Sequence, residues 1–161
     1  MASGPTVLST ARGLPMYNTS SRRRIVIIDN MPDTTIALED SLAKKYEVIT
    51  FNDPEYLLSS FRADMYDMAI VDYLMPKMNG LELCRILRRV DPKMKTLLVT
   101  AYDISIILKH ETGREYLELE NLVTSNSILR KPFTKDELAA KIAFLFGESS
   151  VSLLPARSAC K

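Results

Sequence analysis

Several residue types that common active sites require are scarce in this sequence. It has no tryptophan, a single histidine (His110) and two cysteines, Cys84 and Cys160. One histidine argues against a histidine-rich metal centre and against a Ser-His-Asp triad, so we interpret His110 as a solvated helix residue. Two cysteines without the spacing of metal ligands favour reduced thiols over a disulfide framework, which predicts a cytoplasmic protein.

Long hydrophobic runs and nucleotide-binding motifs are also absent. No apolar run reaches the roughly 18 residues that a transmembrane helix needs, and the N-terminus lacks the apolar stretch of a secretory signal. The formal net charge is +1, so overall charge favours neither a nucleic acid nor a membrane as partner. The absence of Walker A and G-x-G-x-x-G patterns argues against nucleotide binding.

The chain length suits one domain with tails. The 161 residues are 47% hydrophobic and 25% charged, which is ordinary for a globular protein. We predict a flexible N-terminal arm over residues 1–21, a folded domain over 22–147 and a flexible tail over 148–161. Arg22, Arg23 and Arg24 follow the arm, and we interpret them as a solvated charge cluster or, alternatively, as a contact with an anionic surface.

Short apolar runs indicate strands that are buried on both faces. They lie at 25–28, 68–71, 96–99 and 127–130, with a weaker strand at 46–51. Helical patterns alternate with them, at 32–45, 53–62, 79–90 and 134–146, and Thr134 with Glu137 forms a capping box. Residues 102–126 predict a helix at 104–109 and an additional piece at 114–122. The alternation predicts an α/β fold with a doubly wound parallel sheet.

Polar side chains stand where four of these strands end. Asp29, Asp72, Thr100 and Lys131 would meet at the carboxyl edge of a parallel sheet, where such folds bind ligands. Carboxylates suit Mg²⁺, a lysine neutralises phosphoryl oxygens, and an aspartate can act as a covalent nucleophile. The set therefore predicts phosphoryl transfer to a carboxylate.

Four segments resemble the signature segments of response-regulator receiver domains of the CheY-like kind. They are 25–30 (IVIIDN), 71–80 (VDYLMPKMNG), 99–101 (VTA) and 131–133 (KPF). The resemblance covers about residues 24–146. It implies a flavodoxin-like five-stranded parallel sheet of order 2-1-3-4-5 and a role in two-component signalling.

The resemblance also implies a role for each matching residue. Asp72 would be the phosphoacceptor. The Mg²⁺ ligands would be Asp29, Asn30, Asp72 and the backbone oxygen of Leu74. The residues around the phosphoryl group would be Thr100, Ala101 and Lys131, and the Lys131-Pro132 peptide bond would be cis.

The sequence departs from the family pattern at the second acid of the first strand, which is here Asn30. A neutral ligand weakens Mg²⁺ binding and lowers the tendency of Asp72 to hold a proton. Ile128 occupies the position of the family's switch aromatic, and we interpret it as a core residue. Leu74 and Tyr102 stand where the family tunes hydrolysis, which predicts slow loss of the phosphoryl group. The alternative is that Leu74 and Tyr102 only pack on each other.

The resemblance implies a phosphorylation-switched response regulator that is not an enzyme beyond self-phosphorylation and autophosphatase activity. From the chain length we expect a single-domain regulator. Its partners would be a histidine kinase or histidine phosphotransfer protein, and a downstream protein or a second copy of the chain, without direct nucleic-acid or membrane contact. The alternative is a pseudo-receiver that binds proteins independently of phosphorylation. A Mg²⁺-dependent phosphohydrolase is disfavoured because the paired Asp-x-Asp of such enzymes is missing.

Overall fold

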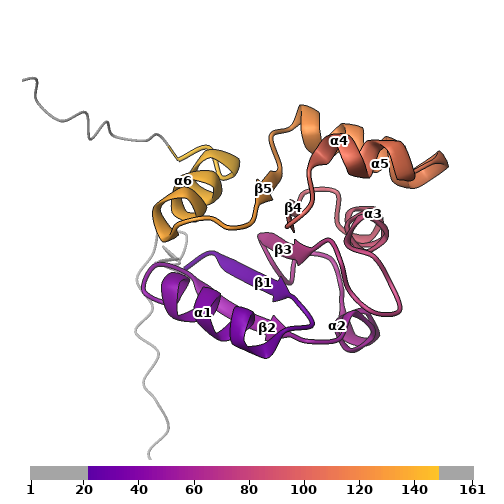
Figure 1. Cartoon of the computed structure of the whole chain (residues 1–161). Coiled ribbons are helices and arrows are strands. Elements are labelled where there is room, and N and C mark those ends of the chain that lie inside the picture. Colours follow the sequence, from indigo (N-terminus) through magenta and orange to yellow (C-terminus); the bar gives the residue numbers. More distant parts are fainter. Residues whose placement is uncertain (1–21, 149–161) are drawn as a thin grey trace, which may run out of the picture.

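The computed structural model describes residues 22–148, and its centre is a five-stranded parallel sheet (Figure 1). The spatial order of the strands is β2-β1-β3-β4-β5, which confirms the predicted topology. The strands are β1 (Arg24–Ile28), β2 (Glu47–Phe51), β3 (Met68–Asp72), β4 (Lys95–Thr100) and β5 (Ile128–Arg130). The predicted arm over 1–21 lies outside the described residues, as does the predicted tail over 148–161 except for Glu148, which pairs with Lys45.

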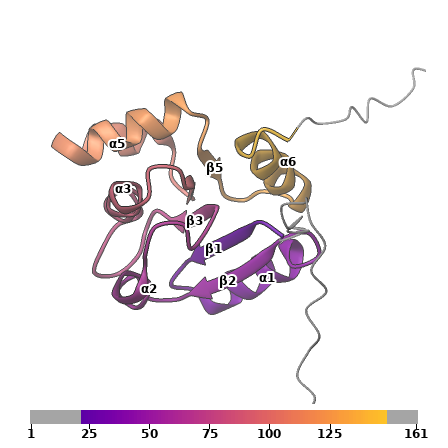
Figure 2. The same cartoon turned by 180° about the vertical axis from the view of Figure 1, so that it is seen from behind.

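Helices cover both faces of the sheet (Figures 1 and 2). They are α1 (Pro32–Leu42), α2 (Pro54–Ser60), α3 (Gly80–Val90), α4 (Ile104–His110), α5 (Gly113–Thr124) and α6 (Lys135–Leu145). Consecutive strand residues face opposite layers: Ile25 packs with α1 and α6, and Val26 packs with the layer of α2 and α3. This two-sided burial explains why β1, β3 and β4 appear in the sequence as apolar runs, whereas the edge strand β2 is only partly buried.

Side-chain caps fix where several helices begin. The Asp53 side chain accepts from the Glu55 N–H at the start of α2, and Asn79 does the same for the Glu82 N–H in α3. The predicted capping box of Thr134 is present at α6. By contrast, α1 has no side-chain cap and ends at Leu42, earlier than the sequence pattern predicted.

The segment between β4 and β5 contains two helices, as predicted. The break falls at Glu111 and Thr112, and α5 begins at Gly113, whose φ of +62° suits glycine. The additional helix α5 packs on α3 through a salt bridge of 2.8 Å between Arg88 and the buried Glu118. This bridge anchors the additional helix to the domain.

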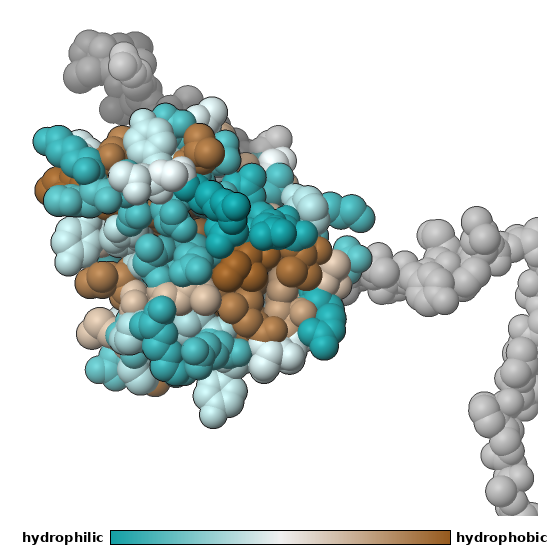
Figure 3. Space-filling model, turned by 90° about the vertical axis from the view of Figure 1, so that its right-hand side faces the viewer, coloured by the Kyte–Doolittle hydropathy of each residue, from teal (hydrophilic) through white to brown (hydrophobic). Residues whose placement is uncertain are grey.

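The face that includes α2 and α3 is largely hydrophilic and carries one gathered hydrophobic patch (Figure 3). On α3, Leu83 is fully buried whereas Ile86 is only half-buried. Within residues 22–148, no helix combines the length and apolarity that crossing a bilayer demands.

Candidate functional site at the carboxyl edge of the sheet

Two acids and a lysine meet at the carboxyl edge of the sheet. Asp72 is the last residue of β3, Asp29 follows β1 and Lys131 follows β5. The Lys131 Nζ donates to Asp72 Oδ1 at 2.8 Å and to Asp29 Oδ2 at 3.1 Å. The side chains of Asp29 and Asp72 are only 4% and 11% exposed, so this ammonium group is the counterion of two largely desolvated carboxylates.

Strand pairing aligns the ends that carry these groups. Asp72 pairs with Val99, and Thr100 pairs with Arg130. The backbone N–H of Lys131 donates to the Thr100 carbonyl at 2.8 Å, which continues the pairing of β4 and β5 by one residue. Parallel strands in this register deliver all their terminal side chains to one edge, as the sequence predicted.

Asp29 is held by its local backbone and by a residue that the sequence reasoning missed. Its Oδ1 accepts from the Met31 N–H at 2.8 Å. The Asn52 side-chain amide donates to the Asp29 carbonyl at 2.9 Å and to the Thr35 hydroxyl at 3.3 Å. Asn52 directly follows β2, so its place at the same edge of the sheet was a signal that could have identified it.

The candidate metal ligands are all oxygen donors. Asp29 and Asp72 already share one cationic group, the Lys131 ammonium, which shows that their carboxylates can converge on a single positive charge. Asn30 and Leu74 are exposed at the rim of the same edge, at its solvent side. Carboxylate, amide and carbonyl oxygens fit a hard cation such as Mg²⁺. Among residues 22–148, there is no cluster of three or more His, Cys, Asp or Glu side chains suited to a metal.

Burial and mutual hydrogen bonding shift the pKa values of Asp72 and Lys131. Burial raises the pKa of the Asp72 carboxyl, and the hydrogen bond with Lys131 opposes that shift. Burial alone would lower the pKa of Lys131, but its hydrogen bond to Asp72 and the charge of Asp29 outweigh burial, so the pKa of Lys131 is raised. Lys131 therefore keeps its positive charge. From the missing negative charge at Asn30 alone, the sequence predicted a lower tendency of Asp72 to hold a proton. The desolvation of Asp72 acts in the opposite direction and raises its pKa.

Thr100 is buried beside the site and its hydroxyl is engaged. Its Oγ1 accepts from the Tyr102 N–H at 3.0 Å. The ring of Tyr102 meets the ring of Tyr73 edge-on, with centroids 6.1 Å apart. The Tyr73 hydroxyl donates to Glu111 Oε1 at 2.7 Å. Sequence reasoning paired Tyr102 with Leu74 and missed both Tyr73 and Glu111.

The remaining candidate residues take less specific places. Ala101 is exposed, and Ile128 is half-buried against the core, in line with its interpretation as a core residue. The Lys131-Pro132 peptide bond is cis, the geometry that the resemblance implies. His110 is exposed in the last turn of α4, in line with its interpretation as a solvated helix residue.

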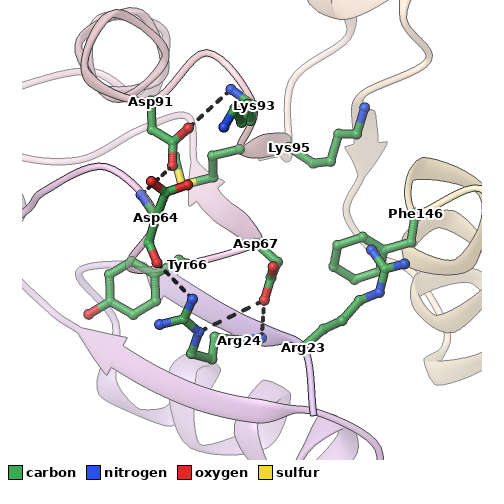
Figure 4. Close-up of a pocket in the computed structure, with 10 residues that line it drawn as sticks. Arg23, Arg24, Asp64, Tyr66, Asp67, Asp91, Lys93, Lys95 and Phe146 are labelled. Atoms are coloured by element: carbon green, nitrogen blue, oxygen red, sulfur yellow. Dashed lines mark hydrogen bonds and ion pairs between the residues drawn. The ribbon is translucent and has the colours of Figure 1, made fainter. Parts of the chain in front are cut away.

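A charged hollow of about 220 Å³ lies elsewhere, at the amino-terminal ends of β1 and β4 (Figure 4). Its charged groups largely bind one another or the backbone. Arg24 donates through its backbone N–H to Asp67 at 2.6 Å, and the Arg23 guanidinium lies 4.2 Å from the centre of the Phe146 ring. These contacts serve the packing of the domain, so we assign the chemistry to the edge that carries Asp72.

Comparisons with known proteins identify the family of the chain. Residues 25–143 match the sequence model of a family described as response regulator receiver domain. The chain is 26% identical over 131 residues to the alkaline phosphatase synthesis transcriptional regulatory protein PhoP of Bacillus subtilis (strain 168). That match covers 81% of this chain and 51% of PhoP, so the chain spans about half the length of that relative.

Two solved structures are similar to this chain. A CheY-like receiver domain protein from Methanospirillum hungatei JF-1 has a TM-score of 0.65 and 23% identity, over 80% of this chain and 96% of that one, and supports the fold. The response regulator TrrA from Thermotoga maritima, solved in complex with Mg²⁺-BeF, has a TM-score of 0.60 and 27% identity, over 76% and 98%. With the match of the family model over most of its length, the chain belongs to the response regulator receiver domains of two-component signalling.

Proposed function

We propose that this chain accepts a phosphoryl group on Asp72 from a histidine kinase or histidine phosphotransfer protein and acts as a phosphorylation-controlled switch. The observation that carries the proposal is the convergence of Asp29 and Asp72 on the ammonium group of Lys131. A nucleophilic carboxylate, an acidic neighbour and a fixed cation are the groups that phosphoryl transfer to an aspartate needs.

In the proposed step, an Asp72 carboxylate oxygen attacks the phosphorus of a phosphohistidine, the P–N bond breaks, and the imidazole leaves with the electron pair and takes up a proton. The product is an acyl phosphate. Lys131 then pairs with a phosphoryl oxygen instead of with the free carboxylate. Asp29, Asn30, Asp72 and the Leu74 carbonyl would hold Mg²⁺, whose charge offsets that of the phosphoryl oxygens.

An apolar hollow of about 530 Å³ beside Lys131 supports the approach of a protein donor. It lies between α1 and the segment that follows β5, and the side chain of Met31 in its lining is 58% exposed. The lining residues are Met31, Asp33, Thr34, Ala37, Leu38, Lys131, Pro132 and Phe133. A donor helix bound there would present its phosphohistidine next to Asp72.

The second candidate function is a pseudo-receiver that binds proteins without being phosphorylated. Asn30 favours it, because a neutral side chain replaces one of the two acids that the family pattern places after the first strand. In either case we expect the domain over 22–147 to bind a downstream protein or a second copy of the chain and to act from the cytoplasm.

Intact-mass spectrometry after incubation with acetyl phosphate and Mg²⁺ tests the proposal. We expect the wild-type chain to gain one phosphoryl group and Asp72→Ala to gain none. Asp40→Ala, which removes an exposed acid of α1, is the matched control and should behave as wild type. Omitting Mg²⁺ should suppress the gain. No gain at any Mg²⁺ concentration would favour the pseudo-receiver.

A further inference from the structure

A continuous chain of contacts runs from the edge of the sheet to the additional helix. It starts at Thr100, whose hydroxyl accepts from the Tyr102 N–H at 3.0 Å. It continues through the edge-on contact of Tyr102 with Tyr73, the residue that directly follows Asp72. It ends at the hydrogen bond of 2.7 Å between the Tyr73 hydroxyl and Glu111 Oε1.

Glu111 is placed to pass a displacement to two helices. It is the C-cap residue of α4, where its backbone N–H donates to the Ile107 carbonyl at 2.9 Å, and α5 begins two residues later at Gly113. The side chain of Tyr73 is only partly exposed and packs against the core. Its hydrogen bond to Glu111 is therefore shielded from solvent on one side, which strengthens it relative to an exposed pair.

The centre of the additional helix is fixed differently from its start. Glu118 is buried and pairs with Arg88 of α3, whereas the start of α5 directly follows the turn that contains Glu111. A shift of Tyr73 would therefore move the junction of α4 and α5 while the centre of α5 stays on α3.

We propose that Tyr73, Tyr102 and Glu111 form a relay through which the state of Asp72 controls the position of the α4–α5 junction. The relay rests on the proposed function, since it reports a phosphoryl group on Asp72. The Thr100 hydroxyl can donate a hydrogen bond to a phosphoryl oxygen, which moves Thr100 toward Asp72. Because the Tyr102 N–H donates to the Thr100 hydroxyl, Tyr102 moves with it. Ile128 has no hydroxyl to exchange between two hydrogen-bonded states, so this relay supplies a hydroxyl contact that position 128 cannot make.

Tyr73→Phe removes the hydroxyl and keeps the ring, so it isolates the hydrogen bond to Glu111. Glu111→Gln keeps an acceptor oxygen and should preserve the relay. Tyr116→Phe removes a different tyrosine hydroxyl, on α5, whose pKa is raised by the nearby Glu120, and is the matched control. Amide hydrogen exchange over residues 101–124 is measured on the full chain, with and without beryllofluoride and Mg²⁺, beside intact-mass analysis of phosphorylation.

In the wild type we expect beryllofluoride to change exchange at the α4–α5 junction. Tyr73→Phe should keep phosphoryl uptake, should exchange about threefold to tenfold faster at the junction because one hydrogen bond is lost, and should lose the response to beryllofluoride. Phosphoryl uptake with the same exchange response as wild type in Tyr73→Phe would overturn the relay alone. No phosphoryl uptake by the wild type would overturn the proposed function and, with it, the signal that the relay reports.

Discussion

The ammonium nitrogen of Lys131 lies 2.8 Å from Oδ1 of Asp72, although 59 residues separate the two in the sequence. The same nitrogen lies 3.1 Å from Oδ2 of Asp29, which is 102 residues away. One cation thus offsets the charge of two carboxylates that are mostly withdrawn from water. The stability of the unmodified domain and its chemistry therefore depend on the same group.

Replacing Lys131 with methionine should destabilise the domain in the absence of Mg²⁺. The change leaves two nearly buried carboxylates without their shared cation, and we expect a loss of about 1–3 kcal/mol in the free energy of unfolding, less than for a fully buried pair because Lys131 is partly exposed. Urea denaturation followed by circular dichroism measures this loss. Lys44→Met, at an exposed position, is the control. Adding Asp72→Asn to Lys131→Met should recover part of the stability, and no recovery would contradict the shared-cation interpretation.

Asn30→Asp should tighten Mg²⁺ binding. Residue 30 is exposed at the rim of the site, so a carboxylate there adds a negative ligand without being buried. We expect a gain of about tenfold in affinity from the added charge. Titration of Mg²⁺ followed by NMR shifts of the Asp29 and Asp72 amides measures it, with Asp33→Asn as the control for charge nearby. Equal affinities of the wild type and Asn30→Asp would show that residue 30 does not reach the ion.

Gly80→Ala should damage both the fold and the acceptor. A Cβ at position 80 would lie 2.3 Å from the backbone oxygen of Asp72 and 2.9 Å from the Tyr73 Cα, so the backbone of the acceptor loop would have to move. We expect a loss of about 2–3 kcal/mol in the free energy of unfolding from this overpacking, together with slower phosphoryl uptake. Glu82→Ala in the same helix turn should change the free energy of unfolding far less. If Gly80→Ala had the stability and the phosphoryl uptake of the wild type, the predicted clash of its Cβ with the backbone of Asp72 would be refuted.

Sequence patterns predicted the parts of the molecule that depend on local chemistry. The strands were recognisable because burial on both faces requires unbroken apolar runs, and α2 and α6 because Asp53 and Thr134 are capping residues. The convergence of Asp29 and Asp72 followed from parallel topology alone. The contact of Tyr73 with Glu111 could not be predicted, because it joins the residue after Asp72 to the turn between α4 and α5, whose path no local pattern determines. The raised pKa of Asp72 likewise depends on burial that arises only after packing.

Cys84 should resist alkylation while the domain is folded. Its side chain is fully buried in the core between α3 and the sheet, and burial raises the pKa of its thiol, so almost no thiolate is present near neutral pH. In a Cys160→Ser background, iodoacetamide at pH 8 should leave the native chain unmodified and should add one group in urea. Mass spectrometry measures the number of added groups in the native chain and in the chain unfolded by urea. Rapid labelling of the native chain would indicate local opening around α3.

Asp91 should make the domain sensitive to acid. Its carboxylate accepts from the backbone N–H of Asp64 at 2.9 Å and from that of Lys93 at 3.1 Å, and it anchors Asp64 in the left-handed region at a φ of 63°. These hydrogen bonds, chiefly the one from Asp64, hold the pKa of Asp91 below its usual 3.8. Because the pKa of Asp91 is lower in the folded state than in the unfolded state, its stabilising contribution is complete at pH values above the unfolded-state pKa. The contribution is lost as the pH falls through the lower, folded-state pKa.

Asp91→Ala should therefore cost about 1–3 kcal/mol in the free energy of unfolding at pH 7, because two backbone donors lose their acceptor. The difference between this variant and the wild type should shrink as the pH falls below the usual pKa of 3.8, since the wild-type carboxylate is then being protonated. Urea denaturation at a series of pH values measures both quantities, with Asp40→Ala as the exposed control. A difference that stays constant down to pH 2 would mean that Asp91 acts through packing and not through its charge.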